Sequence, residues 1–477
     1  MNKLNITYVL GCLLLTFLIL SEESFAQDKS PNFIFILTDD HGWSHTSIGV
    51  DSNNFDSKSD FFETPNIDRL IKGGMSFTNA YAPASICSPT RRSIQYGMTP
   101  ARLGDEEFEN NFDPNEIEGI ISIPWLLKSA NRNYQAAHYG KWDLRADIFP
   151  EDLGYDESDG NTGNRDGNLF TNSADKWDKV FITNNPKRSV SLAERSVNFM
   201  ERQVKKGNPF YLQISHYAPH IDIQSRQETY DKYLRKQRGV KHYNAGWAAM
   251  LEDMDMSIGI ILDKVESLGI SDNTYIIFMS DNGAVEALPQ VRPAIKKLQH
   301  PDLFNIPMRN HPLRGGKWTL YEGGIRVPYI VQGPGVKSGS VSHEAVVGWD
   351  ILPTISELAN YNEQLPDNLD GGSFAEIIKT GGKGKIHRAN DYLIFHRFHS
   401  SYGHSAIIQG NYKLIIFWKS NRMELYNLEN DLGEVTNLAK TNPEKVDEIY
   451  ERLTNYIREV NPNLLEELLS YKTDLGE

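Results

Sequence analysis

Cysteine is nearly missing from this 477-residue sequence, which contains only Cys12 and Cys87. Cys12 lies in a segment with a basic start, an apolar run from Val9 to Leu20 and small residues before Ala26, so we assign residues 1–26 to an export signal. Cleavage would leave Cys87 alone and would exclude an internal disulfide. A lone thiol in an oxidising compartment is buried and inert, paired between chains, or used chemically.

The sequence also lacks a second long apolar run and an excess of positive charge. The first run is short for a bilayer span, so a membrane anchor fits less well than a signal, and stable membrane insertion is not expected. The net charge of −14 would repel nucleic acid, and an anionic substrate would need a locally basic pocket. The composition of the whole sequence, 39% hydrophobic and 23% charged, is that of an ordinary globular protein.

Three short apolar runs, at 32–37, 210–214 and 275–279, each stop abruptly at polar residues. Runs of this kind are typical of strands buried on both faces. Between the second and third, apolar residues recur at helical spacing from Trp247 to Val265, and Gly269 closes the helix. The order strand, helix, strand predicts parallel pairing in an α/β fold.

Paired oxygen ligands follow two of these runs, Asp39 and Asp40 after the first and Asp281 and Asn282 after the third. Either pair alone is best explained as a turn or a helix cap. In open α/β sheets, however, the ends of the strands share one ligand crevice, and adjacent carboxylates repel unless a cation satisfies them. Together the pairs predict a site for calcium, with magnesium fitting less well.

A plausible linker at 381–385 divides a larger unit, residues 27–380, from a smaller one, residues 381–477. The smaller unit is expected to contain a sheet, with strands at 392–395, 406–408 and 412–417, and a helix that begins at Asn442-Pro443. Two irregular stretches, 153–175 and 284–312, are read as loops that either contact substrate or are merely solvated.

Cys87 opens the motif Cys-Ser-Pro-Thr-Arg at 87–91, with Gly97 downstream, and this motif resembles that of the formylglycine-dependent, arylsulfatase-like type I sulfatase family. Alone, the motif could surround a buried structural cysteine. The resemblance continues in family order over nearly the whole mature chain, at 64–70, 140–142, 218–220, 313–317, 321–328 and 424–438. It implies an alkaline-phosphatase-like α/β fold, with a mixed, mainly parallel sheet flanked by helices and a smaller C-terminal domain of antiparallel sheet plus helix.

The resemblance also implies a chemistry for Cys87. A maturation enzyme would oxidise it to formylglycine (3-oxoalanine), and one hydroxyl of the hydrated aldehyde would attack sulfur. Loss of the proton from the other hydroxyl would expel sulfate and restore the aldehyde. One calcium ion would be held by Asp39, Asp40, Asp281 and Asn282, with the nucleophile at position 87 as a further ligand.

Other site residues are carried over in the same way. Arg91 would hold the nucleophile, Lys141 and Lys317 would hold sulfate oxygens, and His220 would donate a proton to the leaving alcohol. Asp143 departs from the family pattern, which usually has histidine there to assist elimination of sulfate. A carboxylate could still take the proton, but it adds negative charge beside an anionic substrate, so its partners or the position of the substrate must differ.

Further basic residues are weaker candidates, because histidines are more often structural than catalytic. His216 could line the pocket, although a satisfied core histidine is the favoured interpretation. The others are His45, Arg309, His311, His396, His399 and His404.

These features predict an exported sulfuric ester hydrolase, periplasmic or secreted. The substrate is expected to be a sulfated polysaccharide or oligosaccharide such as ulvan, carrageenan or fucoidan.

Two alternatives to this function remain. A phosphate or phosphonate ester hydrolase would share the crevice, but such enzymes often use two metal ions and the sequence offers no second complete ligand set. A non-catalytic protein that binds sulfated glycans would not need Cys87, the metal ligands and His220, all of which are present.

Overall fold

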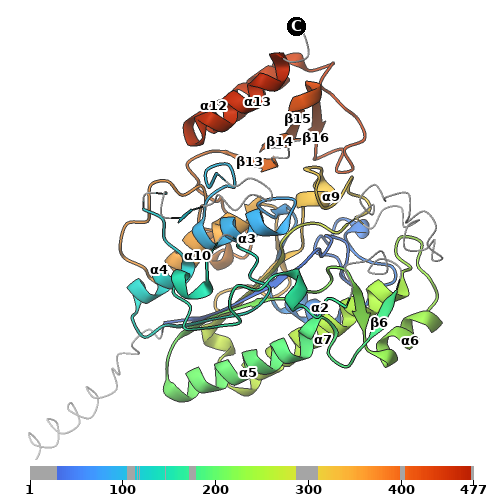
Figure 1. Ribbon diagram of the computed structural model, residues 1–477, viewed down its shortest axis with the longest axis vertical. Coiled ribbons are helices and arrows are strands. Elements are labelled where there is room, and N and C mark those ends of the chain that lie inside the picture. The colour runs from blue at the N-terminus through green and yellow to red at the C-terminus, as the bar shows by residue number, and fades with distance from the viewer. Residues whose placement is uncertain are drawn as a thin grey trace, which may run out of the picture.

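A computed structural model places an eight-stranded sheet at the centre of the molecule (Figure 1). It describes residues 30–104, 113–114, 117, 119–145, 147–170, 179–285, 310–397 and 403–473. The predicted export signal, most of the stretch at 284–312, and the candidates Arg309 and His399 lie outside these ranges.

The central sheet is mixed but mainly parallel. Across it the strands run β11 (Ser340–Ser342), β2 (Met75–Phe77), β10 (Tyr329–Gln332), β9 (Thr274–Ser280), β1 (Asn32–Thr38), β7 (Phe210–Ser215), β4 (Gln135–Gly140) and β5 (Glu157–Ser158). Only β10 runs antiparallel to its neighbours among these pairs. Strands β7 and β9 flank β1 in parallel, as their order in the sequence predicts.

Helices cover both faces of the sheet, because alternate side chains of β1 enter two separate cores. Phe33, Phe35 and Leu37 pack with α3 (Cys87–Tyr96), α4 (Ile123–Ala130), α10 (Ile351–Leu358) and α11 (Ala375–Lys379). Ile34 and Ile36 pack with α2 (Pro65–Gly73), α5 (Ser189–Lys206), α6 (Gln227–Arg235) and α7 (Ala245–Ser267). In Figure 1, α3, α4 and α10 lie above the sheet, and α5 and α7 lie below it. None of the helices in the described ranges is long and apolar enough to span a membrane.

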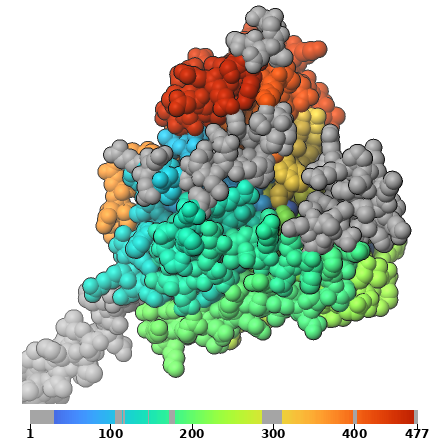
Figure 2. Space-filling view, in the orientation of Figure 1, coloured from blue at the N-terminus to red at the C-terminus, as the bar shows by residue number. Residues whose placement is uncertain are grey.

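A second, antiparallel sheet follows, and with it the predicted fold class is confirmed. Its strands are β13 (Tyr392–Arg397), β14 (His404–Gln409), β15 (Tyr412–Phe417) and β16 (Arg422–Asn427), covered on one face by α12 (Pro443–Val460) and α13 (Pro462–Thr473). The other face packs on the larger unit, where Phe395 meets Tyr81 and Trp349. Figure 2 shows this unit, in red and orange, seated on the rest of the molecule.

The remaining elements are short. Two-stranded ladders join β3 (Ala80–Tyr81) to β12 (Val346–Val347) and β6 (Val180–Ile182) to β8 (Ile223–Ser225), and α9 covers Glu322–Ile325. The interpretation of 153–175 as loop is wrong for β5, a two-residue edge strand that pairs with β4. Such a short strand has no apolar run to mark it.

Buried charges join the two units beneath the apolar contact. Lys413 of β15 lies between Glu322 of α9 and Glu434, with its Nζ 2.8 and 2.9 Å from their carboxylates. Arg326 Nε contacts the same Glu322 at 2.6 Å, and the Glu322 amide donates to Glu434 at 2.7 Å. Lys413, Glu322 and Glu434 are fully buried. Because removing one partner would strand a buried charge, these residues tie α9 firmly to the second sheet.

This junction predicts a pH-dependent contribution to stability. Burial raises the pKa of Glu434 to about 7, with Lys413 opposing and Glu322 adding to the rise. Between the ordinary pKa and this value, the folded protein keeps a proton that the unfolded chain has released, so stability falls as pH rises through that window. Glu434→Gln should flatten this fall. Thermal unfolding of both proteins at pH 5 and pH 8 tests it, and parallel pH profiles would contradict it.

Candidate functional site

The carboxyl ends of β1, its neighbour β9, and β4, which lies one strand further beyond β7, supply the polar residues of one buried cluster. The register pairs Thr38 of β1 with Ser280 of β9, so the residues that follow these strands lie side by side. The cluster contains Asp39 and Asp40 after β1, Asp281 and Asn282 after β9, and Lys141 after β4, all without solvent exposure. Asp40 has a φ of 65°, a conformation that non-glycine residues adopt rarely and that is frequent at functional sites.

Cys87 enters this cluster from the first residue of α3. Its Sγ lies 3.4 Å from Asp39 Oδ1 and 3.4 Å from Lys317 Nζ. Burial and the charges of Asp281 and Asp39 raise the pKa of the thiol well above its usual value. The thiolate is therefore disfavoured at neutral pH, so the unmodified side chain is a poor nucleophile.

Two lysines supply the basic groups that an acidic protein needs around an anion. Lys141 Nζ lies 2.8 Å from Asp39 Oδ2, and Lys317 Nζ lies 2.7 Å from Asp40 Oδ1. Burial alone would lower the pKa of Lys141, but Asp39 and Cys87 raise it well above the usual value. For Lys317, burial is likewise outweighed by Asp40. Both lysines therefore stay charged.

Arg91 connects the ends of β4 and β9. Its Nη2 and Nε donate to Asp281 Oδ2 at 2.7 and 3.1 Å, and its Nη1 donates to the carbonyl of Lys141. Burial and the charge of Asp39 raise the pKa of Asp281 to about 6, although Arg91 opposes the rise. Arg91 thus positions one candidate metal ligand and one lysine together.

Arg91→Ala should therefore destabilise the protein and weaken metal binding together. Loss of one partner from a buried ion pair costs about 3–5 kcal/mol, because the other charge remains buried. We expect a matching fall in the free energy of unfolding in urea, and weaker calcium binding by calorimetry. Arg69→Ala, which breaks exposed ion pairs with Asp263 and Glu266, is the matched control. Equal losses of stability and calcium binding in Arg91→Ala and Arg69→Ala would show that Arg91 does not specifically position the metal site.

The cluster fits a hard divalent cation. Ligand atoms of Asp39, Asp40, Cys87 and Asp281 all lie within 4.8 Å of one another. Asp40 Oδ2 and Asn282 Oδ1 are buried and accept no hydrogen bond from the described residues, while the Asn282 amide donates to Asp40 Oδ1 at 2.7 Å. Buried oxygens without a partner are costly, and a cation coordinated by carboxylates and an amide oxygen would satisfy them.

His220 approaches the cluster from the segment after β7. Its Nδ1 donates to the Ile221 carbonyl at 2.6 Å, which leaves Nε2 directed to the cluster, 3.9 Å from Asp40 Oδ2. Burial and the charge of Lys317 lower the pKa of His220 to about 4. The imidazole is thus neutral at pH 7 before an anion binds.

Asp143 is accommodated by basic neighbours. It lies 3.4 Å from Lys141 Nζ and 3.5 Å from Arg145 Nε. Burial would raise its pKa, but Lys141 and Arg145 bring the pKa below the usual value. Sequence reasoning did not single out Arg145, although an opposite charge two residues from an unusual Asp is a usable signal.

The other histidines have contacts that fit packing or surface roles. His216 is buried and its backbone amide donates to Leu37, but neither ring nitrogen has a hydrogen-bond partner among the described residues, so the interpretation as a satisfied core histidine is wrong. The remaining contacts are His45 with Phe62 and Trp247, His311 with Asp56, His396 with Ser405, and His404 with the Leu320 amide and the Phe417 ring.

Asn310 is a site residue that the sequence did not reveal. Its side chain is buried and donates to the carbonyls of Ala284 and Gly315 at 2.9 and 3.1 Å. The Lys317 amide donates to the same Ala284 carbonyl at 3.0 Å. Asn310 therefore fastens the segment that carries Lys317 to the segment that follows β9. No local pattern distinguishes it from a solvated loop asparagine.

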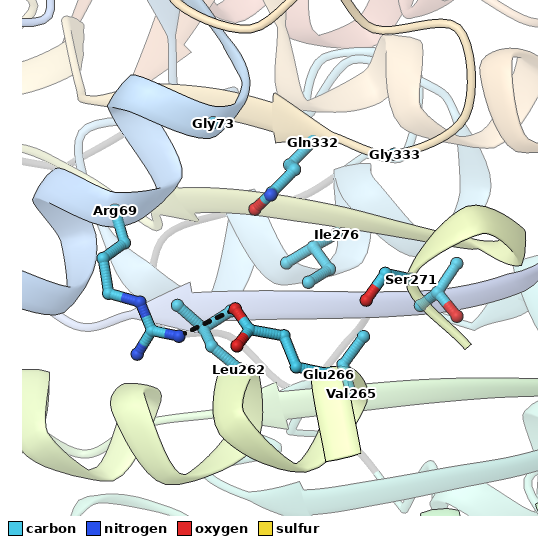
Figure 3. Close-up of a pocket in the computed structure, with 10 residues that line it drawn as sticks. Arg69, Gly73, Leu262, Val265, Glu266, Ser271, Ile276, Gln332 and Gly333 are labelled. Carbon is cyan, nitrogen blue, oxygen red and sulfur yellow. Dashed lines mark hydrogen bonds and ion pairs between the residues drawn. The ribbon is translucent and has the colours of Figure 1, made fainter. Parts of the chain in front are cut away.

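A pocket of about 260 Å³ lies elsewhere, between α2, α7, β9 and β10 (Figure 3). It is bordered by Thr274, the first residue of β9, whereas the cluster follows the last. The pocket is therefore at the opposite end of the sheet. Arg69, which lines it, is paired with Glu266 at 2.9 Å. We assign the chemistry to the cluster around Cys87.

Comparisons with known proteins show which family the chain resembles. A family model described as Sulfatase matches residues 31–361, and one described as N-sulphoglucosamine sulphohydrolase, C-terminal, matches residues 316–463. An uncharacterised sulfatase of Schizosaccharomyces pombe is 30% identical, over 89% of this chain and 93% of its own. N-acetylgalactosamine-6-sulfatase of Mus musculus is 27% identical, over 86% and 76%. The crystal structure of Ps i-CgsB with k-i-k-neocarrahexaose superimposes with a TM-score of 0.69, at 22% identity, over 90% of this chain and 93% of that one.

Proposed function

The chain belongs to the sulfatase family of sulfuric ester hydrolases, and from this membership we propose that it removes sulfate from carbohydrates, using a formylglycine made from Cys87 and one calcium ion. The observation that carries the proposal is the buried cluster in which Cys87 meets three carboxylates and two lysines. The maturation enzyme would replace the Cβ–S bond of Cys87 by a C=O bond, a two-electron oxidation that uses an external oxidant such as dioxygen and releases the sulfur as sulfide. The signal-like start of the chain supports export to the periplasm or beyond.

Lys141 and Lys317 would hold the sulfate oxygens. Each ammonium has three donors and uses only part of them on Asp39 or Asp40, so donors remain for an anion. Calcium on Asp39, Asp40, Asp281 and Asn282 would neutralise charge on the sulfonyl group. The hydrated aldehyde supplies a hydroxyl that attacks sulfur and a second hydroxyl whose deprotonation releases sulfate. Arg91 holds Asp281 and the backbone of Lys141 in place through its hydrogen bonds to both.

His220 would protonate the leaving alcohol oxygen through Nε2. In the free protein its pKa of about 4 makes it neutral, but an anionic sulfate ester beside it raises the pKa and favours the imidazolium. Asp143 would replace the family histidine as acceptor of the proton lost during elimination. Arg145 and Lys141 offset the negative charge that Asp143 brings near the substrate.

Relatives support a sugar substrate. One is named for a sulfated amino sugar, and one solved structure contains an oligosaccharide of the carrageenan type. We propose a polysaccharide or oligosaccharide such as ulvan, carrageenan or fucoidan for this chain. The net charge of −14 repels a polyanionic glycan overall, so attraction must come from the local lysines rather than from the whole surface.

The test combines two measurements on protein made together with a formylglycine-generating enzyme. Mass spectrometry of the Cys87 peptide should show the aldehyde, and ion chromatography should detect sulfate released from oligosaccharides of the three polysaccharides. Faster turnover of matched phosphate esters would favour a phosphate ester hydrolase instead. Glycan binding without turnover, by protein shown to contain the aldehyde, would favour a non-catalytic role.

A further inference from the structure

One flank of the site is bordered by a segment that the proposed chemistry does not use. We define Thr162–Phe170 as the rim segment. At its start, the Thr162 carbonyl accepts from the Asp143 amide at 2.8 Å, and the Thr162 hydroxyl oxygen accepts from the Trp142 amide at 3.0 Å. The rim segment thus begins directly beside Lys141 and Asp143.

The far end of the rim segment is fixed to residues that flank His220 in the chain, Tyr217 before it and Asp222 after it. A Cβ at Gly167 would lie 2.5 Å from Cγ of Tyr217, so the Gly167 backbone lies directly against that side chain. The Phe170 amide donates to Asp222 Oδ2 at 3.0 Å, and the Asn168 carbonyl accepts from Gln224 at 2.6 Å. The rim segment therefore runs from the Asp143 side of the site to the His220 side.

The anchor at Asp222 is rigid. Asp222 and Lys187 are buried, and Lys187 Nζ contacts Asp222 Oδ1 at 2.7 Å. Gln224 donates to the same oxygen at 2.8 Å. Each of these groups has at least one partner inside the protein, so the backbone amide of Phe170 is held by a buried network rather than by solvent-exposed contacts.

Phe170 ends the rim segment as an exposed aromatic ring. It is 53% exposed, and its ring stacks on Phe181 of β6 with centroids 5.3 Å apart and planes 10° apart. Phe181 is held in turn by the pairing of β6 with β8, opposite Gln224. Stacking on Phe181 thus fixes the orientation of the exposed Phe170 ring, which lies nearly parallel to the ring of Phe181.

We propose that Phe170 is a sugar-stacking subsite, which binds the face of a pyranose ring next to the sulfated residue of the substrate. This inference rests on the proposed function. The C–H bonds on one face of a pyranose form an apolar surface that matches a flat, uncharged aromatic ring, and a rigid ring loses little entropy on binding. A sulfate group suits the lysines of the cluster and not Phe170, so the subsite selects the neighbouring sugar. The enzyme therefore recognises at least two sugar units.

Kinetics with paired substrates test the subsite. The probes are an oligosaccharide of carrageenan, ulvan or fucoidan from which wild-type protein releases sulfate, and the sulfated monosaccharide of the same sugar. Phe170→Ala should lower kcat/KM for the oligosaccharide roughly tenfold, the scale of one lost aromatic contact, and leave the monosaccharide within about twofold. Phe170→Tyr should keep the wild-type ratio, and Phe170→Leu should behave as Phe170→Ala, because only the ring face is needed.

Leu234→Ala on α6 is the matched control, since Leu234 is 58% exposed and should leave both substrates unchanged. Equal losses on both substrates, or full activity of Phe170→Leu on the oligosaccharide, would overturn the subsite while the sulfatase function stands. If wild-type protein that contains the aldehyde released sulfate from a sulfated monosaccharide but from none of the oligosaccharides screened as probes, that would also overturn the subsite. Wild-type protein that releases no sulfate from either probe would overturn the proposed function and this inference together.

Discussion

Cys87→Ala protein is expected to release sulfate at least roughly 10⁴-fold more slowly than matured wild type, the scale on which an enzyme loses its nucleophile. The variant should fold normally, because the contacts of Sγ with Asp39 and Lys317, both at 3.4 Å, are weak hydrogen bonds of a thiol. The measurement is single-turnover sulfate release, with circular dichroism to check the fold.

Wild-type protein made without the maturation enzyme is the second arm of this experiment. Its thiol has a raised pKa and is a poor nucleophile, so it should be as inactive as Cys87→Ala. Coexpression of the maturation enzyme should restore the wild type and leave the variant unchanged. Unmatured protein that turns over at the matured rate would show that the aldehyde is not the nucleophile.

Removal of calcium should abolish sulfate release and lower the melting temperature by several degrees. A ligand present at 100 times its dissociation constant stabilises a protein by about 2.7 kcal/mol. In this cluster, Asp40 Oδ2 and Asn282 Oδ1 would also lose their partner. Chelation followed by dialysis against calcium or magnesium, with scanning calorimetry and sulfate release as readouts, checks the expectation. Calcium should restore both properties, and magnesium should restore them less well because it prefers shorter bonds and a fixed octahedron.

Asp40→Asn locates the calcium effect. It should abolish the calcium-dependent rise in melting temperature, since it removes one ligand charge and leaves Lys317 Nζ with a weaker partner. Asp263→Asn, which changes an exposed carboxylate, is the control and should keep the full rise. Identical calcium responses in both variants would place the ion elsewhere.

The sequence predicts the parts of this fold that obey a single local rule. Strands β1, β7 and β9 are readable because burial on both faces demands an uninterrupted apolar run. The two-residue β5 shows no run, and the antiparallel direction of β10 depends on the path of the preceding segment. Among the C-terminal elements, α13 was not predicted, because the apolar pattern of α12 already accounts for one helix.

The residues of the candidate site likewise fall into those that the sequence predicts and those that it does not. Asp39, Asp40, Asp281 and Asn282 are predictable because strand ends gather ligands at one edge of a parallel sheet. Cys87, Lys141 and Lys317 were found through motifs, and the structure brings them to that edge. Asn310 acts through a loop path that only tertiary structure fixes, so no spacing rule selects it, whereas the spacing of Arg145 from Asp143 is a signal that the sequence does contain. The predicted boundary near 380 stays a prediction.

The buried junction of Lys413 with Glu322 and Glu434 limits how such enzymes can be recombined. Glu322 lies five residues beyond Lys317, and the Gly324 carbonyl accepts from the Gly283 amide next to the metal ligands. A chimera that exchanges the C-terminal sheet for one without a basic residue at this position would leave the Glu322 and Glu434 carboxylates without a shared counter-ion. An exchanged C-terminal sheet would therefore have to carry a basic residue at the position of Lys413 for the segment that contains Lys317 and Glu322 to keep its place.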